Sequence, residues 1–229
     1  MTGIDKKEGD GDNTNTDLSS AYGEYRRAAR RARELDDLET AGSFYVAASR
    51  IGMAESFPLP DDNRPPDAST ANKLFFTQAL REFLLGSLCF RLADCGDRCQ
   101  RHCEQGVAIM TDVRDTLFHD PAEIGLGYEI IGDFQLVAGF NNYNESYSLA
   151  AEQYATIDND LGWQMEDGFD DFSLIAVELA DSAGLGPENG DRERIRRTSL
   201  DARAKFKQEQ FPEVIEAIIT RGNWKSDTI

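Results

Sequence analysis

The chain has 229 residues, and its 42 acidic and 24 basic side chains give it a formal net charge of −18. Its 40% hydrophobic content is enough to bury the core of one large domain, which excludes a wholly disordered chain. No apolar run approaches the roughly 18 residues of a membrane-spanning helix, and so negative a surface repels nucleic acid and anionic lipid. We therefore expect a soluble protein with no membrane partner, for which nucleic acid is a poor candidate ligand.

The N-terminal part of the sequence predicts a polar tail followed by a helical hairpin. Residues 1–16 have few hydrophobic side chains and many Gly, Asp, Asn and Thr, which is typical of a disordered tail. This tail has neither the apolar stretch of a secretory signal nor the Arg-rich character of a transit peptide, so we expect a cytoplasmic protein. Over residues 17–56, apolar residues recur at spacings of three and four on both sides of Asp36-Asp37, which predicts two helices with a turn between them.

Two more hairpins are predicted in the middle of the chain. Four of the seven prolines lie in residues 57–67, and because proline interrupts a helix, this segment is expected to be an extended loop. Helical periodicity then covers residues 68–118 with a turn at residues 95–97, and residues 121–158 with a turn at Asn141-Asn142.

The C-terminal part predicts shorter helices within residues 163–221. A Gly/Pro break at residues 184–190 separates a weak helical pattern from a basic helix, and Pro212 is expected to begin a short last helix. Residues 222–229 are expected to form a second tail. Because no segment shows the strict alternation of a strand, we expect one all-α domain over residues 17–221, with about eight or nine helices.

Three of these hairpins share small residues at the helix contacts, a turn rich in Gly, Asp or Asn, and an aromatic residue that packs across the pair. In this they resemble tetratricopeptide repeats. The resemblance implies a stacked α-solenoid whose first helices line a concave groove, and such folds usually bind other proteins. The turns lie 60 and 45 residues apart instead of the regular spacing of about 34, so insertions separate the units. The residues that carry the resemblance are Tyr25, Ala28, Ala29, Ala41, Tyr45, Ala48, Gly86, Gly96, Asp97, Asn142, Tyr143, Ala150 and Tyr154.

Arginines gather on the first predicted helix. Arg26, Arg30 and Arg33 share one face, which the repeat resemblance places in the groove. Guanidinium groups one turn apart suit carboxylate or phosphate, because each can donate to two oxygens. We therefore expect these arginines to anchor another protein through an acidic segment or a carboxylate terminus, with Tyr22 and Tyr25 packing around them. The alternative is a solvated face paired with neighbouring acidic residues.

The four cysteines, Cys89, Cys95, Cys99 and Cys103, form a second candidate site. Such clustering predicts, as the alternative function, a metal- or redox-responsive regulator that would bind zinc. Cys95 and Cys103 would lie about 12 Å apart along one helix, too far for one zinc ion. A site would therefore need the turn to fold Cys89 back against Cys99 or Cys103. The competing interpretation is that the cysteines are small packing residues and that the protein has no cofactor.

The negative charge is concentrated between Asp115 and Asp191, where 17 acidic residues occur without a Lys or Arg. The bias to Asp over Glu (24 to 18) and to Arg over Lys (18 to 6) resembles proteins of halophilic archaea, whose acidic surfaces stay solvated in molar salt. Solvation of this kind is one interpretation of the block, including the acidic run at residues 166–171. The other is attraction to a basic partner or to the basic stretch at residues 192–207.

Catalytic motifs are missing from the sequence. The chain has two histidines, His102 and His119, and no motif typical of a metalloprotease, a serine hydrolase or a phosphate-binding loop. We therefore expect a protein that is not an enzyme and acts as an interaction scaffold or adaptor.

Overall fold

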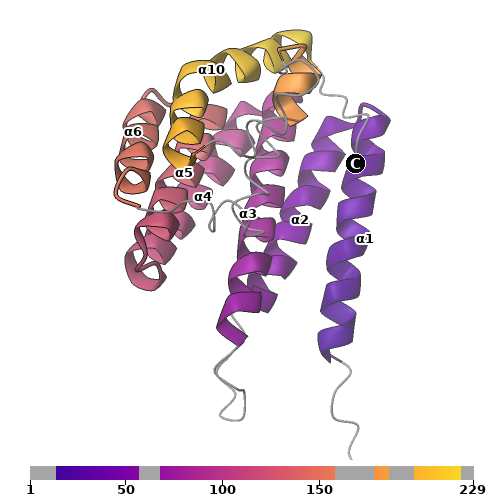
Figure 1. Cartoon of the computed structure of the whole chain (residues 1–229). Helices are drawn as coiled ribbons and strands as arrows, with labels where there is room; N and C mark the ends of the chain where they lie inside the picture. The colour runs from indigo at the N-terminus through magenta and orange to yellow at the C-terminus, as the bar shows by residue number, and fades with distance from the viewer. Residues whose placement is uncertain (1–13, 57–67, 158–177, 186–198, 223–229) are drawn as a thin grey trace, which may run out of the picture.

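The computed structural model describes residues 14–56, 68–157, 178–185 and 199–222 (Figure 1). These residues form helices joined by turns, and this part of the chain contains no strand. The prediction of an all-α fold is confirmed. Among the described helices, none is long and apolar enough to cross a membrane.

The first three helices are α1 (Thr14–Glu34), α2 (Leu38–Ser56) and α3 (Ala68–Leu92). Helix α1 begins inside the segment expected to be a tail, whose first 13 residues lie outside the described residues, as does the predicted loop at 57–67. The turn between α1 and α2 lies where the sequence predicts it, and Asp36 adopts a left-handed conformation with φ of 63°. Asp tolerates this conformation better than most residues, which explains why the chain reverses there.

The next helices are α4 (Gly96–Leu117), α5 (Pro121–Ala138) and α6 (Tyr143–Tyr154). The turn before α4 comes slightly earlier than predicted, because Asp94 takes the left-handed conformation (φ 57°) and Gly96 already belongs to the helix.

Helix α5 has a clear local signal at each end. The Asp120 side chain accepts a hydrogen bond from the Ala122 backbone N–H, and Pro121 stands in the first turn, where its missing N–H costs nothing. At the other end Gly139 adopts φ of 81° and donates its N–H to the last carbonyl groups of the helix. The helix therefore ends at Ala138, three residues before Asn141.

The C-terminal prediction needs one correction. Pro212 does not begin a new helix but lies inside α10 (Leu200–Arg221). Proline lacks the N–H that would bond to the Gln208 carbonyl, yet Phe211 and Val214 on either side of it are buried in the core. Their packing holds the two halves in one helix. Of the weak pattern at 163–183, residues 178–183 are helical, while 158–177 and 186–198 lie outside the described residues.

The helices pack in chain order. Each helix from α1 to α6 contacts the next along the chain, α10 contacts α6 and α5, and α3 also contacts α5. In Figure 1, α1 stands at one edge, α6 at the opposite edge, and α10 crosses near α5 and α6. This order is compatible with stacked hairpins, and a regular solenoid geometry stays a prediction.

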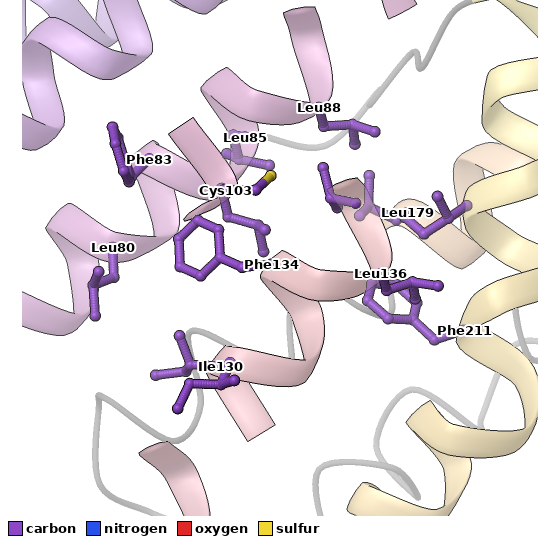
Figure 2. Close-up of a cluster of buried hydrophobic side chains, with 14 of the residues drawn as sticks. Leu80, Phe83, Leu85, Leu88, Cys103, Ile130, Phe134, Leu136, Leu179 and Phe211 are labelled. Carbon is purple, nitrogen blue, oxygen red and sulfur yellow. The ribbon is translucent and has the colours of Figure 1, made fainter. Parts of the chain in front are cut away.

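The core lies along α3 and α5. Residues 81–90 of α3 are all buried, so this helix is covered on every side. Figure 2 shows Phe83, Cys103 and Phe134 in this core, where the rings of Phe83 and Phe134 lie 6.0 Å apart. A Cβ atom at Gly106 would lie 2.6 Å from the Phe134 ring, so α4 and α5 approach closely only because this position lacks a side chain.

Candidate functional site

The structure divides the arginines of α1 between two faces. Arg33 is 8% exposed, and Arg26 and Arg30 are partly buried. Arg26 and Arg30 interact with Glu82 of α3, and Arg33 lies near Cys89 of the same helix. Arg27 and Arg31 are exposed on another side of the same helix. The three arginines of the predicted site therefore lie together, but they point into the protein and not straight into solvent.

A buried carboxylate stands at the centre of this group. The Glu82 side chain is 1% exposed, and its Oε1 atom lies 2.8 Å from Nε of Arg26 and 3.9 Å from Nη1 of Arg81. Arg81, on α3, is a member that the sequence analysis missed, because its own helix is otherwise strongly apolar. We call Arg26, Arg30, Arg33 and Arg81 the arginine cluster.

A second carboxylate reaches the arginine cluster from a distant part of the chain. Oε2 of Glu178 lies 3.5 Å from Nη2 of Arg81, and its side chain keeps 22% of its surface exposed. Glu178 is the first described residue of the helical stretch at 178–183, whose Leu179 and Ala180 are buried in the core. Among the described residues, Glu82 thus lies against Arg26 and Arg81, and Glu178 lies against Arg81.

Burial and the neighbouring charges shift the pKa of Arg30. Burial lowers the pKa of Arg30, the charges of Arg26 and Arg81 lower it further, and Glu82 opposes them in part. The direction means that the surroundings of Arg30 disfavour its positive charge, although a guanidinium stays protonated at any physiological pH. An additional anion at this point would remove part of that penalty.

The two tyrosines of the predicted site have different surroundings. Tyr22 is buried, and the Arg26 guanidinium lies 5.4 Å from the centre of its ring, so Tyr22 packs beside the arginine cluster as expected. Tyr25 is 38% exposed and turns toward α2, where its ring lies 6.0 Å from that of Phe44. The structure therefore brings Tyr22 to the arginines and directs Tyr25 elsewhere.

A second group of charges, which we call the ionic cluster, joins α5 to α10. Both oxygens of Glu129 are engaged, because Nη2 of Arg203 lies 2.6 Å from one and Nζ of Lys207 lies 2.8 Å from the other. Lys207 also lies 2.6 Å from Oδ2 of Asp133. The two acids are fully buried, and so is Lys207, while Arg203 is 4% exposed.

Two tyrosines of α6 complete the ionic cluster. The Tyr154 hydroxyl donates to Oε2 of Glu129 at 2.8 Å, and the Tyr147 hydroxyl donates to Oδ1 of Asp133 at the same distance. Burial alone raises the pKa of Glu129, but the charges of Arg203 and Lys207 outweigh it and hold that pKa at about 2. Burial raises the pKa of Asp133 to about 6 despite the attraction of Lys207.

Among the described residues, the ionic cluster joins two acids to two bases. Glu129 and Asp133 belong to the acidic block at residues 115–191, and Arg203 and Lys207 belong to the basic stretch at residues 192–207. The ionic cluster is therefore a contact between these two parts of the chain, as the expected attraction requires. The acidic run at residues 166–171 lies outside the described residues. The sequence does contain a signal for this cluster. Glu129 and Asp133 lie four residues apart in an otherwise apolar helix, and Arg203 and Lys207 have the same spacing on α10, so each pair lies on one helix face.

The four cysteines are free thiols, and the structure does not gather them around one point. Cys89 is buried near Arg33 and Glu82, and burial raises the pKa of its thiol to about 12. Cys99 and Cys103 contact each other on α4, where Sγ of Cys99 lies 3.6 Å from the Val137 carbonyl oxygen. Cys95 is partly buried before the first turn of α4. Within the described parts of the chain, no three Cys, His, Asp or Glu side chains stand in position to hold a metal ion.

Comparison with known proteins adds no identification. No protein-family model matches the chain, and no curated protein or solved structure gives a significant match. The resemblance to tetratricopeptide repeats therefore stays a prediction.

Proposed function

We propose that this protein is a non-catalytic scaffold that binds an acidic segment of another protein at the arginine cluster between α1 and α3. The observation that supports the proposal is that Arg26, Arg30 and Arg33 come from one stretch of α1, where Arg26 and Arg30 stay partly exposed in a chain of net charge −18.

The geometry of the arginine cluster suits a carboxylate ligand. The Arg26 side chain keeps 26% of its surface exposed, and Arg30 is also partly exposed. A partly buried guanidinium group has lost part of its hydration, so water screens its charge less. A carboxylate that accepts hydrogen bonds from two such groups should therefore bind more strongly than one that pairs with a fully exposed arginine. The partner's acid would thereby offset the repulsion that Arg26 and Arg81 impose on Arg30.

The test uses two neighbouring arginines as a matched pair. Arg30 belongs to the arginine cluster, while Arg31 is exposed on another face of α1. Arg30→Ala and Arg31→Ala remove the same charge from the same helix. Affinity capture from the native host, at its native salt concentration and with quantitative mass spectrometry, should recover one protein with the wild type and Arg31→Ala, and about tenfold less of it with Arg30→Ala.

Circular dichroism of the three proteins serves as the folding control. The same set and amounts of captured proteins for both variants would show that the arginine cluster does not bind the partner, and the proposal would then be wrong.

A further inference from the structure

A further group of basic side chains gathers where α2 and α4 flank the same aromatic residues of α3. Arg50 belongs to α2, and Arg98, Arg101 and His102 belong to α4. Arg50 and Arg101 are exposed, whereas Arg98 and His102 are partly buried. None of the four belongs to the arginine cluster or the ionic cluster, and we call them the α4 basic site.

Aromatic rings of α3 hold two members of the α4 basic site in place. The His102 ring stacks on Phe90 with the ring centres 5.3 Å apart, and it meets Phe83 edge to face at 5.4 Å. The Arg98 guanidinium lies 4.0 Å from the centre of the same Phe90 ring. Because Phe83 and Phe90 are buried in the core, they form a fixed apolar support for both polar side chains.

The His102 ring is held by these ring contacts and not by hydrogen bonds. Its Nδ1 atom is buried and has no hydrogen-bond partner among the described residues. Most buried polar atoms of native proteins have such a partner, so an exception needs a physical explanation. His102 therefore keeps hydrogen-bonding capacity that the described contacts of the fold do not use.

The charges around His102 are mainly positive. Burial lowers the pKa of His102, and the charges of Arg50, Arg98 and Arg101 each lower it further. These three arginines reach His102 from α2 and from its own helix, while α3 contributes the uncharged rings of Phe83 and Phe90. The surroundings of His102 thus favour a nearby anion, although the whole chain has a net charge of −18.

Two of the three arginines remain available to such an anion. Arg98 lies 2.6 Å from Oε1 of Glu39, so its charge is paired. Arg101 donates its Nε–H to the backbone carbonyl oxygen of Asp97 at 3.1 Å, a contact that leaves its charge in place. Over the described ranges of the chain, neither Arg50 nor Arg101 has a carboxylate within ion-pairing distance.

This set of donors suits a phosphate group. A phosphate monoester carries close to two negative charges at neutral pH and has three strong acceptor oxygens. A guanidinium group can donate to two of these oxygens at once, and a histidine nitrogen can donate to another. A carboxylate has one charge and two oxygens, so it would satisfy fewer of the donors that Arg50, Arg101 and His102 offer.

We propose that Arg50, Arg101 and His102 bind the phosphate group of a phosphate monoester between α2 and α4. Arg98 adds positive charge to this site and is positioned by Phe90 and Glu39. The inference does not depend on the proposed function, because it concerns other residues and another ligand.

The two histidines of the chain, His102 and His119, allow a direct test by NMR. Inorganic phosphate is titrated into the full chain at pH 7 while potassium chloride keeps the ionic strength constant, and ring Cε1–Hε1 signals are recorded. His119→Gln assigns the signals. The His102 signal should shift and saturate with a millimolar Kd, while the signal of exposed His119 stays in place. Acetate should shift the His102 signal much less.

Arginine variants show which groups bind the phosphate. Arg50→Ala and Arg101→Ala should each raise the Kd for inorganic phosphate by about threefold or more, because each removes a charged donor. Arg31→Ala is the matched control, since it removes the same charge from an exposed position of α1 and should keep the wild-type Kd. Thermal melts show that each variant is folded at the temperature of the titration.

Two phosphate monoesters then distinguish the sources of the ligand. A phosphoserine peptide and adenosine monophosphate are each titrated in the same way, and the one with a Kd below that of inorganic phosphate identifies a modified protein or a nucleotide as the source. The proposal would be overturned if neither ligand shifted the His102 signal. It would also be overturned by equal responses to phosphate and acetate, or by wild-type Kd values for both Arg50→Ala and Arg101→Ala.

Discussion

The two charged clusters contain the same kinds of side chain but differ in how far those side chains are exposed to solvent. The ionic cluster pairs two acids with two bases and adds two tyrosine hydroxyls, and its acids are 0% exposed. In the arginine cluster, Glu82 lies against Arg26 and Arg81, and the Arg26 side chain keeps 26% of its surface exposed. Buried ion pairs fix the position of a helix, whereas partly exposed charges can still attract another molecule.

The largest expected effect is on the ionic cluster. Lys207→Met removes a buried cation that lies between Glu129 and Asp133, so two acids with no exposed side-chain surface lose a shared partner. Leaving a buried charge unpaired typically destabilises a protein by about 3–5 kcal/mol. Urea denaturation followed by circular dichroism should show a loss of this size in the free energy of unfolding.

Restoring the balance tests the reason for that loss. Lys207→Met combined with Asp133→Leu removes one charge of each sign, and this double variant should recover a large part of the stability because an apolar pair can replace a buried ion pair. A double variant that is less stable than Lys207→Met would contradict the role of charge balance.

The second expected effect concerns pH. The pKa of Asp133 is raised to about 6 from its usual 3.8, so its contribution to stability is present below pH 3.8 and is lost as the pH rises through 6. The pKa of Glu129 is held at about 2, below its usual 4.5, so its contribution is present above pH 4.5 and is lost as the pH falls through 2. Burial and pairing thus give the two acids of one cluster opposite pH dependences.

Asp133→Asn isolates one of these contributions. The wild type should lose stability relative to Asp133→Asn between pH 4.5 and pH 7, on the order of 2 kcal/mol, as measured by urea denaturation at several pH values. Glu145→Gln, at an exposed position of α6, should keep the wild-type profile. Parallel profiles for the wild type and Asp133→Asn would contradict a raised pKa for Asp133.

The smallest expected effect is on the arginine cluster. Arg30→Ala should change the free energy of unfolding by less than about 1 kcal/mol, because the loss of its packing is offset by relief of its repulsion from Arg26 and Arg81. The same denaturation measurement applies, with Arg31→Ala as the reference. If Arg30→Ala destabilised the protein as much as Lys207→Met, the arginine cluster would be a second structural cluster, and the comparison between the two would fail.

Helix positions followed from local sequence signals. Asp36-Asp37 marks the first turn, and Asp120, Pro121 and Gly139 set the ends of α5, because capping and backbone conformation depend on residues within one turn. Pro212 shows the limit of such signals. Its local preference predicts a helix start, but the burial of Phe211 and Val214 keeps α10 continuous.

The candidate sites were predictable only in part. The spacing of Arg26, Arg30 and Arg33 places them on one face, since that follows from helix geometry alone. Neither Arg81 nor Glu178 could be assigned to the same site from the sequence, because each lies on a separate helical segment, far from the others in sequence. The cysteines show that closeness in sequence does not ensure a common site. Cys89 lies near Arg33 and Glu82, whereas Cys103 lies near Cys99 and Ser87.

The sequence by itself determined the helical character, the main turns and the uneven charge of −18, because periodicity, capping and composition are local or additive properties. Only the tertiary structure decided which charged side chains are paired with each other and how far they are buried. Glu129 meets Lys207 across 78 residues of chain, and Arg81 meets Glu178 across 97. Whether a charged side chain stabilises the fold or remains able to attract a ligand depends on its nearest opposite charge and its exposure to water, and both are set by how distant helices pack.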